Sequence, residues 1–259
     1  MGPMGTTGSH LWTRARLVNN LTEFSQMTTR RFFLAASGIF LTGATIARAE
    51  DTCAVFTKGT QSATTSDQAL ARLKEGNARF VSGQTIHCDL RAQVKETASG
   101  QAPFAAILGC MDSRVPPELV FDQHLGDIFS VRIAGNFVNT DILGSLEYAT
   151  KVAGAKLIVV LGHTDCGAIK GAVDDVKLGN LTTTLASIRP AVLKLASAEG
   201  DHTSKNKQFV QSVADQNAKD AAAILTARSD VIASLVKEHK LGIISAMHDV
   251  RTGTVSWFA

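Results

Sequence analysis

Residues 156–161 read Lys-Leu-Ile-Val-Val-Leu, so that five apolar residues, three of them β-branched, follow one another without a polar break. A strand with one solvent-exposed face alternates apolar and polar residues, whereas a strand that is covered on both faces has a continuous apolar sequence. Strands of that kind belong to parallel sheets, whose neighbouring strands are joined by crossover connections that are usually helices. This run therefore predicts an α/β fold.

Other short apolar runs and helical patterns alternate along the chain in agreement with that fold. We expect strands at 104–108 and 128–133, and a closing strand pair at 243–247 and 254–258 around a turn at 251–253. We expect helices at 66–82 with Ser66 as N-cap, 142–152 as a crossover, 167–175, 181–195 with a boundary at Pro190, 205–226 and 229–239. Residues 50–65 are expected to be extended and 84–100 to be surface helix or loop. The prediction is one catalytic domain over 50–259, with a mainly parallel sheet flanked by helices.

Residues 27–49 are typical of an export signal. Arg30 and Arg31 precede an apolar run, Phe32–Ile46, of about 15 residues, which is short of the roughly 20 needed to span a bilayer. Ala47-Arg48-Ala49 fits a cleavage site, so the mature chain is expected to begin at Glu50 without a stable membrane anchor. The order of these parts resembles a twin-arginine signal and predicts a periplasmic protein. A general secretory signal, an uncleaved anchor, and a true start at Met27 remain alternatives.

The charge balance argues against nucleic acid as a partner. The chain has 26 Lys and Arg against 23 Asp and Glu, but five of the arginines and only one of the acidic residues lie in residues 1–49. The remaining 21 basic and 22 acidic residues carry almost no net charge. The basic excess therefore belongs to the leader, and we expect no nucleic-acid surface.

Two segments that follow predicted strands carry the chemistry. Cys110-Met111-Asp112-Ser113-Arg114 comes after the strand at 104–108, and His163-Thr164-Asp165-Cys166-Gly167 comes after the strand at 156–161. Open α/β sheets place their sites at the carboxyl ends of their strands. Two thiolates and one imidazole suit Zn²⁺, which prefers tetrahedral nitrogen and sulfur ligands. We therefore predict a zinc site formed by Cys110, His163 and Cys166.

Three protein ligands leave a fourth position open, which is typical of a catalytic rather than a structural zinc site. A water bound there has a pKa of about 7. Asp112 and Arg114 alternate with Cys110 and would point to the same side of an extended segment, so Arg114 would keep Asp112 ionised. Asp112 would then accept a hydrogen bond from the bound hydroxide, or close the site as the fourth ligand. The amide of Gly167, at a helix start, would face a developing oxyanion.

Other interpretations of the cysteines and histidines stay open. Cys110 and Cys166 could form a disulfide in an oxidising compartment, or Cys166 could be a thiol nucleophile with His163 as its base. Cys53 and Cys88 could form a structural disulfide after export, or remain free thiols. The other histidines lie outside any cluster and are expected at the surface or in packing: His87, His124, His202, His239 and His248.

At these residues the chain resembles the β-class carbonic anhydrases, from about Ser66 to Phe258. The resemblance rests on five stretches: Leu73–Phe80, Cys110–Pro116, Gly126–Phe129, Ala134–Asn136 and Gly162–Ala168. The combination of Cys-x-Asp-x-Arg with His-x-x-Cys is highly specific, although either half alone would be weak. Two positions depart from the family pattern, Ala134 where valine is common and His248 where tyrosine tends to stand.

The resemblance implies reversible hydration of carbon dioxide to bicarbonate and a proton by a zinc lyase. It implies zinc on Cys110, His163 and Cys166, a catalytic dyad of Asp112 and Arg114, and substrate-binding roles for four residues: Gln101, Gly167, Phe129 and Tyr148. It also implies a homodimer or a dimer of dimers, with the site at the interface and Phe129 supplied by the neighbouring subunit.

Three rival functions remain. The first is hydrolysis of CS₂ or COS, which close relatives carry out at a similar zinc site. A periplasmic zinc-binding protein without catalysis would have no need of Asp112, Arg114 and Gln101 together. A thiol redox protein would carry a Cys110–Cys166 disulfide and no metal.

Overall fold

The computed structural model describes residues 53–258. The export signal, its cleavage site and the start of the mature chain at Glu50 lie outside the described residues and stay predictions. Among the described residues, no helix combines the length and the apolar character that crossing a membrane requires.

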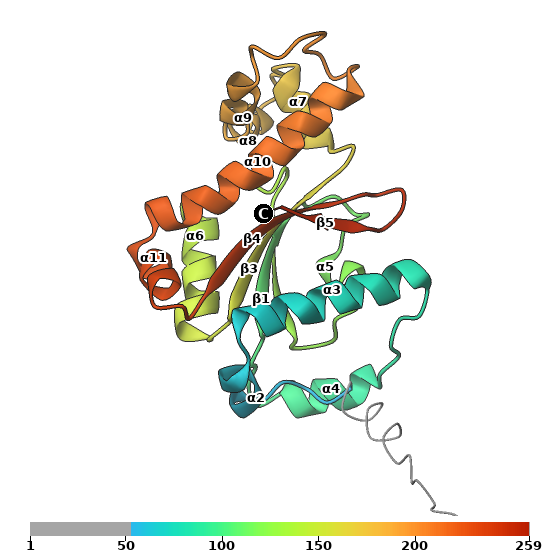
Figure 1. Cartoon of the computed structure of the whole chain (residues 1–259), viewed down its shortest axis with the longest axis vertical. Helices are drawn as coiled ribbons and strands as arrows, with labels where there is room; N and C mark the ends of the chain where they lie inside the picture. The colour runs from blue at the N-terminus through green and yellow to red at the C-terminus, as the bar shows by residue number, and fades with distance from the viewer. Residues whose placement is uncertain (1–52, 259) are drawn as a thin grey trace, which may run out of the picture. The chain divides into compact units, whose positions relative to one another are not determined.

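A five-stranded sheet in the order β2-β1-β3-β4-β5 forms the centre of the fold (Figure 1). The strands are β1 (Ala105–Gly109), β2 (Ile128–Arg132), β3 (Leu157–His163), β4 (Gly242–His248) and β5 (Val255–Trp257). β1 pairs in parallel with β2 and β3, and β3 pairs in parallel with β4, whereas β5 returns antiparallel to β4. The predicted α/β class with a mainly parallel sheet and a closing strand pair is confirmed.

Every residue of β1 and β3 is buried, as the apolar runs predicted, because helices cover both faces of these strands. Side chains alternate between the faces. Ala106, Leu108 and Val160 face a core made with the helices α6, α10 and α11, whereas Ile107 and Val159 face a core made with α3 and α5. α3 and α10 accordingly lie on opposite sides of the central strands in Figure 1.

The helices follow the predicted order. They are α2 (Lys58–Ala63), α3 (Ser66–Ser82), α4 (Leu90–Thr97), α5 (Pro117–Val120), α6 (Thr140–Glu147), α7 (Gly167–Val173), α8 (Leu181–Ala186), α9 (Arg189–Lys194), α10 (Lys207–Arg228) and α11 (Asp230–Lys237), and the π-helical turn is η1 (Tyr148–Val152). A third core, at the carboxyl ends of the strands, packs α7, α8, α9 and α10 around Cys110 and Cys166.

Local details differ from the sequence-based expectations. Thr65, not Ser66, caps α3, because its side chain accepts from the amide of Gln68 while the Gln68 side chain accepts from the Thr65 amide. The stretch 50–65 is not wholly extended, since it contains α2. The break in 181–195 falls before Pro190, which sits in the first turn of α9, where proline is tolerated.

Candidate metal centre

Three residues meet at the carboxyl ends of the two central strands. Cys110 follows β1, His163 is the last residue of β3, and Cys166 is the N-cap of α7. All three are buried, and their ligand atoms lie within 4.8 Å of one another. The sequence reasoning predicted this meeting from the position of both segments after predicted parallel strands, and the structure shows that β1 and β3 are direct neighbours in the sheet.

The imidazole of His163 is oriented to use one nitrogen as a ligand. Its Nδ1 lies 2.9 Å from the carbonyl oxygen of Thr164, which can only accept, so Nδ1 carries the proton. Nε2 therefore keeps a free lone pair, and it is buried without a hydrogen-bond partner. Such an atom is costly unless something binds it. A backbone carbonyl that fixes the second ring nitrogen is the usual support of a histidine metal ligand.

The two sulfurs of the cluster are 3.9 Å apart and belong to free cysteines. That separation is about twice the length of an S–S bond, so the alternative of a Cys110–Cys166 disulfide is wrong in this structure. The hydrogen bond from Cys166 lowers the pKa of the Cys110 thiol to about 4, whereas the same bond and burial raise the pKa of Cys166. Thiolates and a neutral imidazole are the donor set that Zn²⁺ prefers, so these residues fit the ion.

Asp112 and Arg114 form a two-pronged ion pair beside this cluster. Arg114 donates from Nε to Oδ1 at 2.9 Å and from its terminal nitrogen to Oδ2 at 2.8 Å, and its amide also donates to Oδ1 at 3.0 Å. Arg114 holds the pKa of that carboxyl well below its usual range. Oδ2 lies 3.9 Å from Nε2 of His163. The structure thus places an ionised carboxylate next to the cluster, with its orientation fixed by the guanidinium.

Two further residues support the loop of Cys110 and were not predicted. Arg132, at the end of β2, donates to the carbonyl oxygens of Cys110 at 2.9 Å and of Asp112 at 2.6 Å. Gly135 donates its amide to the Cys110 sulfur at 3.3 Å. Gly135 has φ +79, and a Cβ there would come within 2.4 Å of the buried side chain of Ile188, so a larger residue would be strained and would displace Ile188. The parallel pairing of β1 with β2 was the only signal that could have placed Arg132 beside Cys110.

The four predicted substrate-binding residues are split between two places. Gly167 begins α7, directly after Cys166, as expected. Phe129 pairs with Ala106 in the sheet, four residues before Cys110, so it lies roughly 13 Å away along the strand direction. Tyr148 packs edge-on against Phe129, and Gln101 precedes β1. Gln101, Phe129 and Tyr148 thus lie towards the opposite end of the strands from Cys110 of the same chain.

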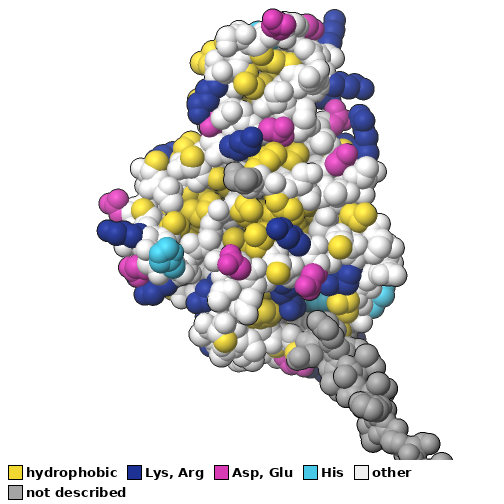
Figure 2. Space-filling view, viewed as in Figure 1, with side chains coloured by type: hydrophobic (Ala, Val, Ile, Leu, Met, Phe, Trp, Pro, Cys, Tyr) yellow, Lys and Arg dark blue, Asp and Glu magenta, His cyan; other side chains and the backbone are white. Residues whose placement is uncertain are grey.

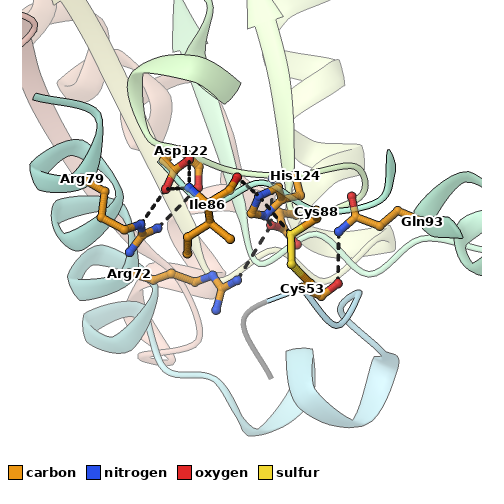
Figure 3. Close-up of a disulfide and its surroundings, with 9 residues drawn as sticks. Cys53, Arg72, Arg79, Ile86, Cys88, Gln93, Asp122 and His124 are labelled. Carbon is orange, nitrogen blue, oxygen red and sulfur yellow. Dashed lines mark hydrogen bonds and ion pairs between the residues drawn. A yellow bond between two sulfur atoms is a disulfide. The ribbon is translucent and has the colours of Figure 1, made fainter. Parts of the chain in front are cut away.

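The other histidines among the described residues lie outside the cluster, as predicted. His248, on β4, is the sheet neighbour of His163, and it is buried with neither ring nitrogen hydrogen-bonded. Burial, followed by the nearby His163, lowers the pKa of His248 to about 4, so its ring is neutral. Cys53 and Cys88, for which both a disulfide and free thiols were open, form a disulfide (Figure 3).

Comparisons with known proteins agree with this site. Residues 105–255 match the carbonic anhydrase family. The chain is 39% identical over 190 residues to carbonic anhydrase 2 of Mycobacterium tuberculosis, a match that covers 70% of this chain and 87% of the relative. It is 35% identical over 192 residues to the carbonic anhydrase of Mycolicibacterium smegmatis, covering 71% and 88%.

Solved structures show the same fold. A β-carbonic anhydrase of Sordaria macrospora, from a study of two tetrameric enzymes, superposes with a TM-score of 0.58 at 28% identity, covering 64% of this chain and 85% of the other. One of Aspergillus fumigatus superposes with a TM-score of 0.59 at 25% identity, covering 74% and 89%. Given a family match over more than half its length and a relative at 39% identity, the chain belongs to the β-class carbonic anhydrases.

Proposed function

We propose that the protein catalyses the reversible hydration of carbon dioxide to bicarbonate and a proton, with a zinc ion held by Cys110, His163 and Cys166. The observation that carries the proposal is the buried, unpartnered Nε2 of His163, which lies in a cluster with two thiol sulfurs next to an ionised carboxylate. Bound there, zinc would supply the Lewis acidity that makes water a nucleophile at neutral pH.

Asp112 would orient the attacking water. Its carboxylate is ionised and can only accept a hydrogen bond, so it favours a protonated oxygen as its neighbour and excludes an aprotic anion. Arg114 fixes both carboxylate oxygens, which lowers the entropy cost of keeping Asp112 in place. The same ion pair favours the form of the site in which Asp112 stays on Arg114 rather than becoming a fourth metal ligand.

Gly167 would help bind the product anion. Its amide is one of the first in α7, where backbone N–H groups have no partner within the helix. Since nothing lies within 4 Å of the position a Cβ would occupy, the approach to this amide is open. The partial positive charge at a helix start favours the negative charge that develops when carbon dioxide becomes bicarbonate.

A homodimer would complete the substrate pocket. Gln101, Phe129 and Tyr148 lie towards the other end of the strands from the metal centre of their own chain, so in this proposal a second copy brings them to it. β2 is an edge strand, and beside it lies a cavity of about 850 Å³ lined by Phe129, Val131 and Tyr148 among others. Tyr148 packs edge-on against Phe129 and is 51% exposed, and exposed apolar side chains grouped in this way are typical of an interaction surface.

A second apolar face supports the pairing of dimers. Hydrophobic side chains gather between α3 and α10, over β4 and β5 (Figure 2). Ile243, Ile244 and Trp257 are among the incompletely buried apolar residues of these strands. A face of this kind is typical of a contact between subunits. We therefore include a dimer of dimers in the proposal.

We also propose that the protein acts in the periplasm after export by the twin-arginine route. Arg30 and Arg31 in the leader and the Cys53–Cys88 disulfide support this, since disulfides persist in oxidising compartments. Changing both arginines to lysine should keep the protein in the cytoplasm. Periplasmic protein in cells carrying that variant would overturn the export route.

Stopped-flow measurement of carbon dioxide hydration tests the catalytic proposal. The protein is first quantified for zinc by elemental analysis and then assayed between about pH 6 and 9, the span over which a zinc-bound water titrates. We expect activity in proportion to zinc content. Protein that carries one zinc per chain and hydrates no carbon dioxide would refute the activity, and active protein without metal would refute the zinc site.

A parallel assay with CS₂ and COS separates the proposed reaction from its nearest rival. Hydration of carbon dioxide and hydrolysis of CS₂ or COS need the same metal centre, so zinc content does not distinguish these reactions. We expect hydration of carbon dioxide to be the faster reaction by orders of magnitude. If the protein hydrolysed CS₂ faster, CS₂ and not carbon dioxide would be its substrate. The assignment of the metal centre would be unaffected.

A further inference from the structure

The disulfide between Cys53 and Cys88 lies next to the imidazole of His124 (Figure 3), and the carboxylate of Asp127 lies on the other side of that ring. The Cys88 sulfur is 3.4 Å from Nε2 of His124. On the other side of the same ring, Nδ1 lies 3.6 Å from the Oδ2 of Asp127. Sulfur, imidazole and carboxylate in this order form the arrangement that activates a thiol for nucleophilic chemistry. The sequence reasoning assigned His124 to surface or packing.

Several contacts hold the imidazole in place. The His124 amide donates to Asp127 Oδ2 at 3.0 Å, and Nε2 also lies 3.2 Å from the carbonyl oxygen of Ile86. Ile86 is two residues before Cys88, so this contact ties the ring to the segment that carries the sulfur. The side chain of Asp127 is only 3% exposed, and Arg72 lies 3.8 Å from it. These contacts do not depend on the S–S bond, so they should persist when that bond is broken.

The charges around the ring favour its protonated form. The nearby carboxylate of Asp127 raises the pKa of His124 above its ordinary value, and the Ile86 carbonyl and the charge of Asp122 act in the same direction against the opposing effect of burial. The nearby cations, Arg72 and Arg79, are themselves paired with Asp127 and Asp122. A protonated imidazole beside a sulfur stabilises the thiolate over the thiol.

We propose that Cys88, His124 and Asp127 form a second reactive site, at which the Cys53–Cys88 disulfide exchanges with low-molecular-weight or protein thiols. Nothing in the hydration of carbon dioxide requires this arrangement, and it is separate from the metal cluster. A disulfide that only stabilises the fold would need no imidazole supported by a buried carboxylate. The site makes Cys88 the better leaving group and, once reduced, the stronger thiolate of the pair at low pH.

The exchange proceeds in two balanced steps. An external thiolate attacks the Cys53 sulfur, a new S–S bond forms there, and the Cys53–Cys88 bond breaks with its electron pair on the Cys88 sulfur, to which His124 donates a hydrogen bond. A second external thiolate then attacks the mixed disulfide and releases Cys53. Two external thiols are oxidised to one disulfide, and the protein disulfide is reduced to two thiols.

A cavity gives reagents access to the released Cys88 sulfur. It has a volume of about 440 Å³ and is lined by Cys88, His87 and His124 with the apolar side chains of Leu90, Leu119 and others. Leu90 and Leu119 are more than half exposed. The apolar lining favours reagents that carry a hydrophobic group next to the thiol or disulfide. Cys53 and Cys88 are both half-buried, and attack falls on Cys53 because the imidazole next to Cys88 makes that sulfur the better leaving group.

A trapping experiment on the unmodified protein tests the direction of exchange. The purified oxidised protein is treated with glutathione at pH 6.5, quenched with iodoacetamide, and mapped by peptide mass spectrometry without reduction. We expect glutathione on Cys53 and the alkyl group on Cys88. Exchange that requires denaturant, or glutathione distributed equally over both cysteines or mainly on Cys88, would overturn the proposal.

The second experiment measures the thiolate directly. The protein is reduced with a trialkylphosphine, and the rate of alkylation of Cys88 and Cys53 by iodoacetamide is followed against pH. We expect Cys88 to titrate at least one unit below the ordinary cysteine value of about 8.5, and Cys53 to titrate near that value. Because one pKa unit changes the thiolate fraction about tenfold, His124→Gln should slow the alkylation of Cys88 at pH 6.5 about tenfold.

His87→Gln is the matched control, since His87 lines the same cavity but is not paired with the sulfur. This variant should alkylate like the unmodified protein. Circular dichroism checks that both variants fold. Equal slowing in both variants, or a Cys88 that titrates like Cys53 in the unmodified protein, would overturn the role of His124. If a variant does not fold, the trapping experiment and the titrations of Cys88 and Cys53 still test the proposal, because they use the unmodified protein.

Discussion

At the scale of single residues, the ionised state of Asp112 is the feature on which turnover depends most. Asp112→Asn keeps the size of the side chain but adds a donor where the mechanism needs an acceptor. We expect zinc to be retained and the rate of hydration to fall by about 10²–10⁴-fold, the range typical of a positioned acid–base group. Stopped-flow assays on zinc-quantified protein measure this.

Asp165→Asn is the control for that variant. Asp165 is an exposed carboxylate one residue before Cys166, paired with Lys170 rather than with Arg114. Its substitution should leave turnover within a few-fold. If both variants were equally impaired, general electrostatics near the cluster would explain the loss, and the specific role of Asp112 would be refuted.

Cys166 is expected to hold the metal and, through it, part of the folding free energy. Cys166→Ser removes one thiolate from a buried cluster of three ligand atoms. We expect zinc content to fall from one per chain to a small fraction, and the midpoint of thermal unfolding to fall with it, because metal binding is coupled to folding. Full zinc content in this variant by elemental analysis would refute the ligand assignment.

The residues of the metal cluster could be predicted from sequence because each lies at or shortly after the carboxyl end of a strand that the pattern makes recognisable. Arg132 and Gly135 could not, because their roles depend on distances across the sheet and on the close approach of Ile188. The motif Leu73–Phe80 shows that a stretch shared with the family can have a structural rather than a catalytic role, which the sequence alone does not reveal. Asn77 bonds to Val120, Gly253 and Val255, so this part of the family pattern supports the fold.

At the scale of elements, β4 places a neutral histidine in the core. The pKa of His248 is lowered to about 4 by burial, whereas in the unfolded chain it is about 6.5. The unfolded state therefore binds more protons between these values, so stability is complete above about pH 6.5 and is lost as pH falls towards 4. At pH 5 the loss from this residue is about 2 kcal/mol.

Urea unfolding of the unmodified protein and of His248→Phe at pH 7.5 and 5 measures this loss. Phenylalanine cannot titrate. Between pH 7.5 and 5, the free energy of unfolding should therefore fall by about 2 kcal/mol less in the variant than in the unmodified protein. An equal fall in both proteins would show that other groups cause the acid sensitivity.

The disulfide joins two segments that precede the sheet, and its loss should lower stability. It closes a loop with a sequence separation of 35 residues, for which the loss of chain entropy in the unfolded state corresponds to roughly 3–4 kcal/mol. Cys53→Ser with Cys88→Ser should lower the free energy of unfolding in urea by about that amount. Since neither residue belongs to the metal cluster, carbon dioxide hydration by the folded variant should stay within about twofold. A much larger loss of turnover would contradict this separation.

Element types could be predicted well because both faces of the central strands are covered, which makes their sequence pattern distinctive. Element ends were less predictable. Both Thr65 and Ser66 are good capping residues, and only the side-chain bond to Gln68 shows which one caps α3. The short helix α2 has a capping box formed by two threonines, Thr57 and Thr60, and carries no apolar periodicity that would reveal it.

At the scale of the whole molecule, we expect a second copy of the chain to complete the proposed pocket. Gln101, Phe129 and Tyr148 were assigned by resemblance, and only the register of β1 with β2 shows that they lie towards the other end of the strands. The residue pattern itself holds no signal for which surface a second copy covers, and only the family resemblance implied that Phe129 comes from a neighbouring subunit. Among the described residues, β2 forms one edge of the sheet and the ring of Tyr148 is exposed, so we expect the second copy to cover this surface.

Ser145→Arg tests whether a second copy covers this surface. Ser145 is exposed on α6 and lines the cavity beside β2, and its hydroxyl bonds only to the carbonyl of Asp141 in its own helix. In a symmetric dimer the substitution places an arginine on each side of the same interface. Burying charges without partners should weaken the dimer about a hundredfold or more, so sedimentation analysis should find mainly monomer.

Turnover is the second readout, because the monomer would lack the residues supplied by its partner. Zinc content should stay normal while hydration falls at least about tenfold, since a displaced binding group costs that much or more. Ser212→Arg on α10 is the matched control, as Ser212 is also exposed and bonds only to a carbonyl four residues before it. A monomeric Ser145→Arg with full turnover would show that one chain completes its own pocket, and an intact oligomer would show that this edge is not the interface.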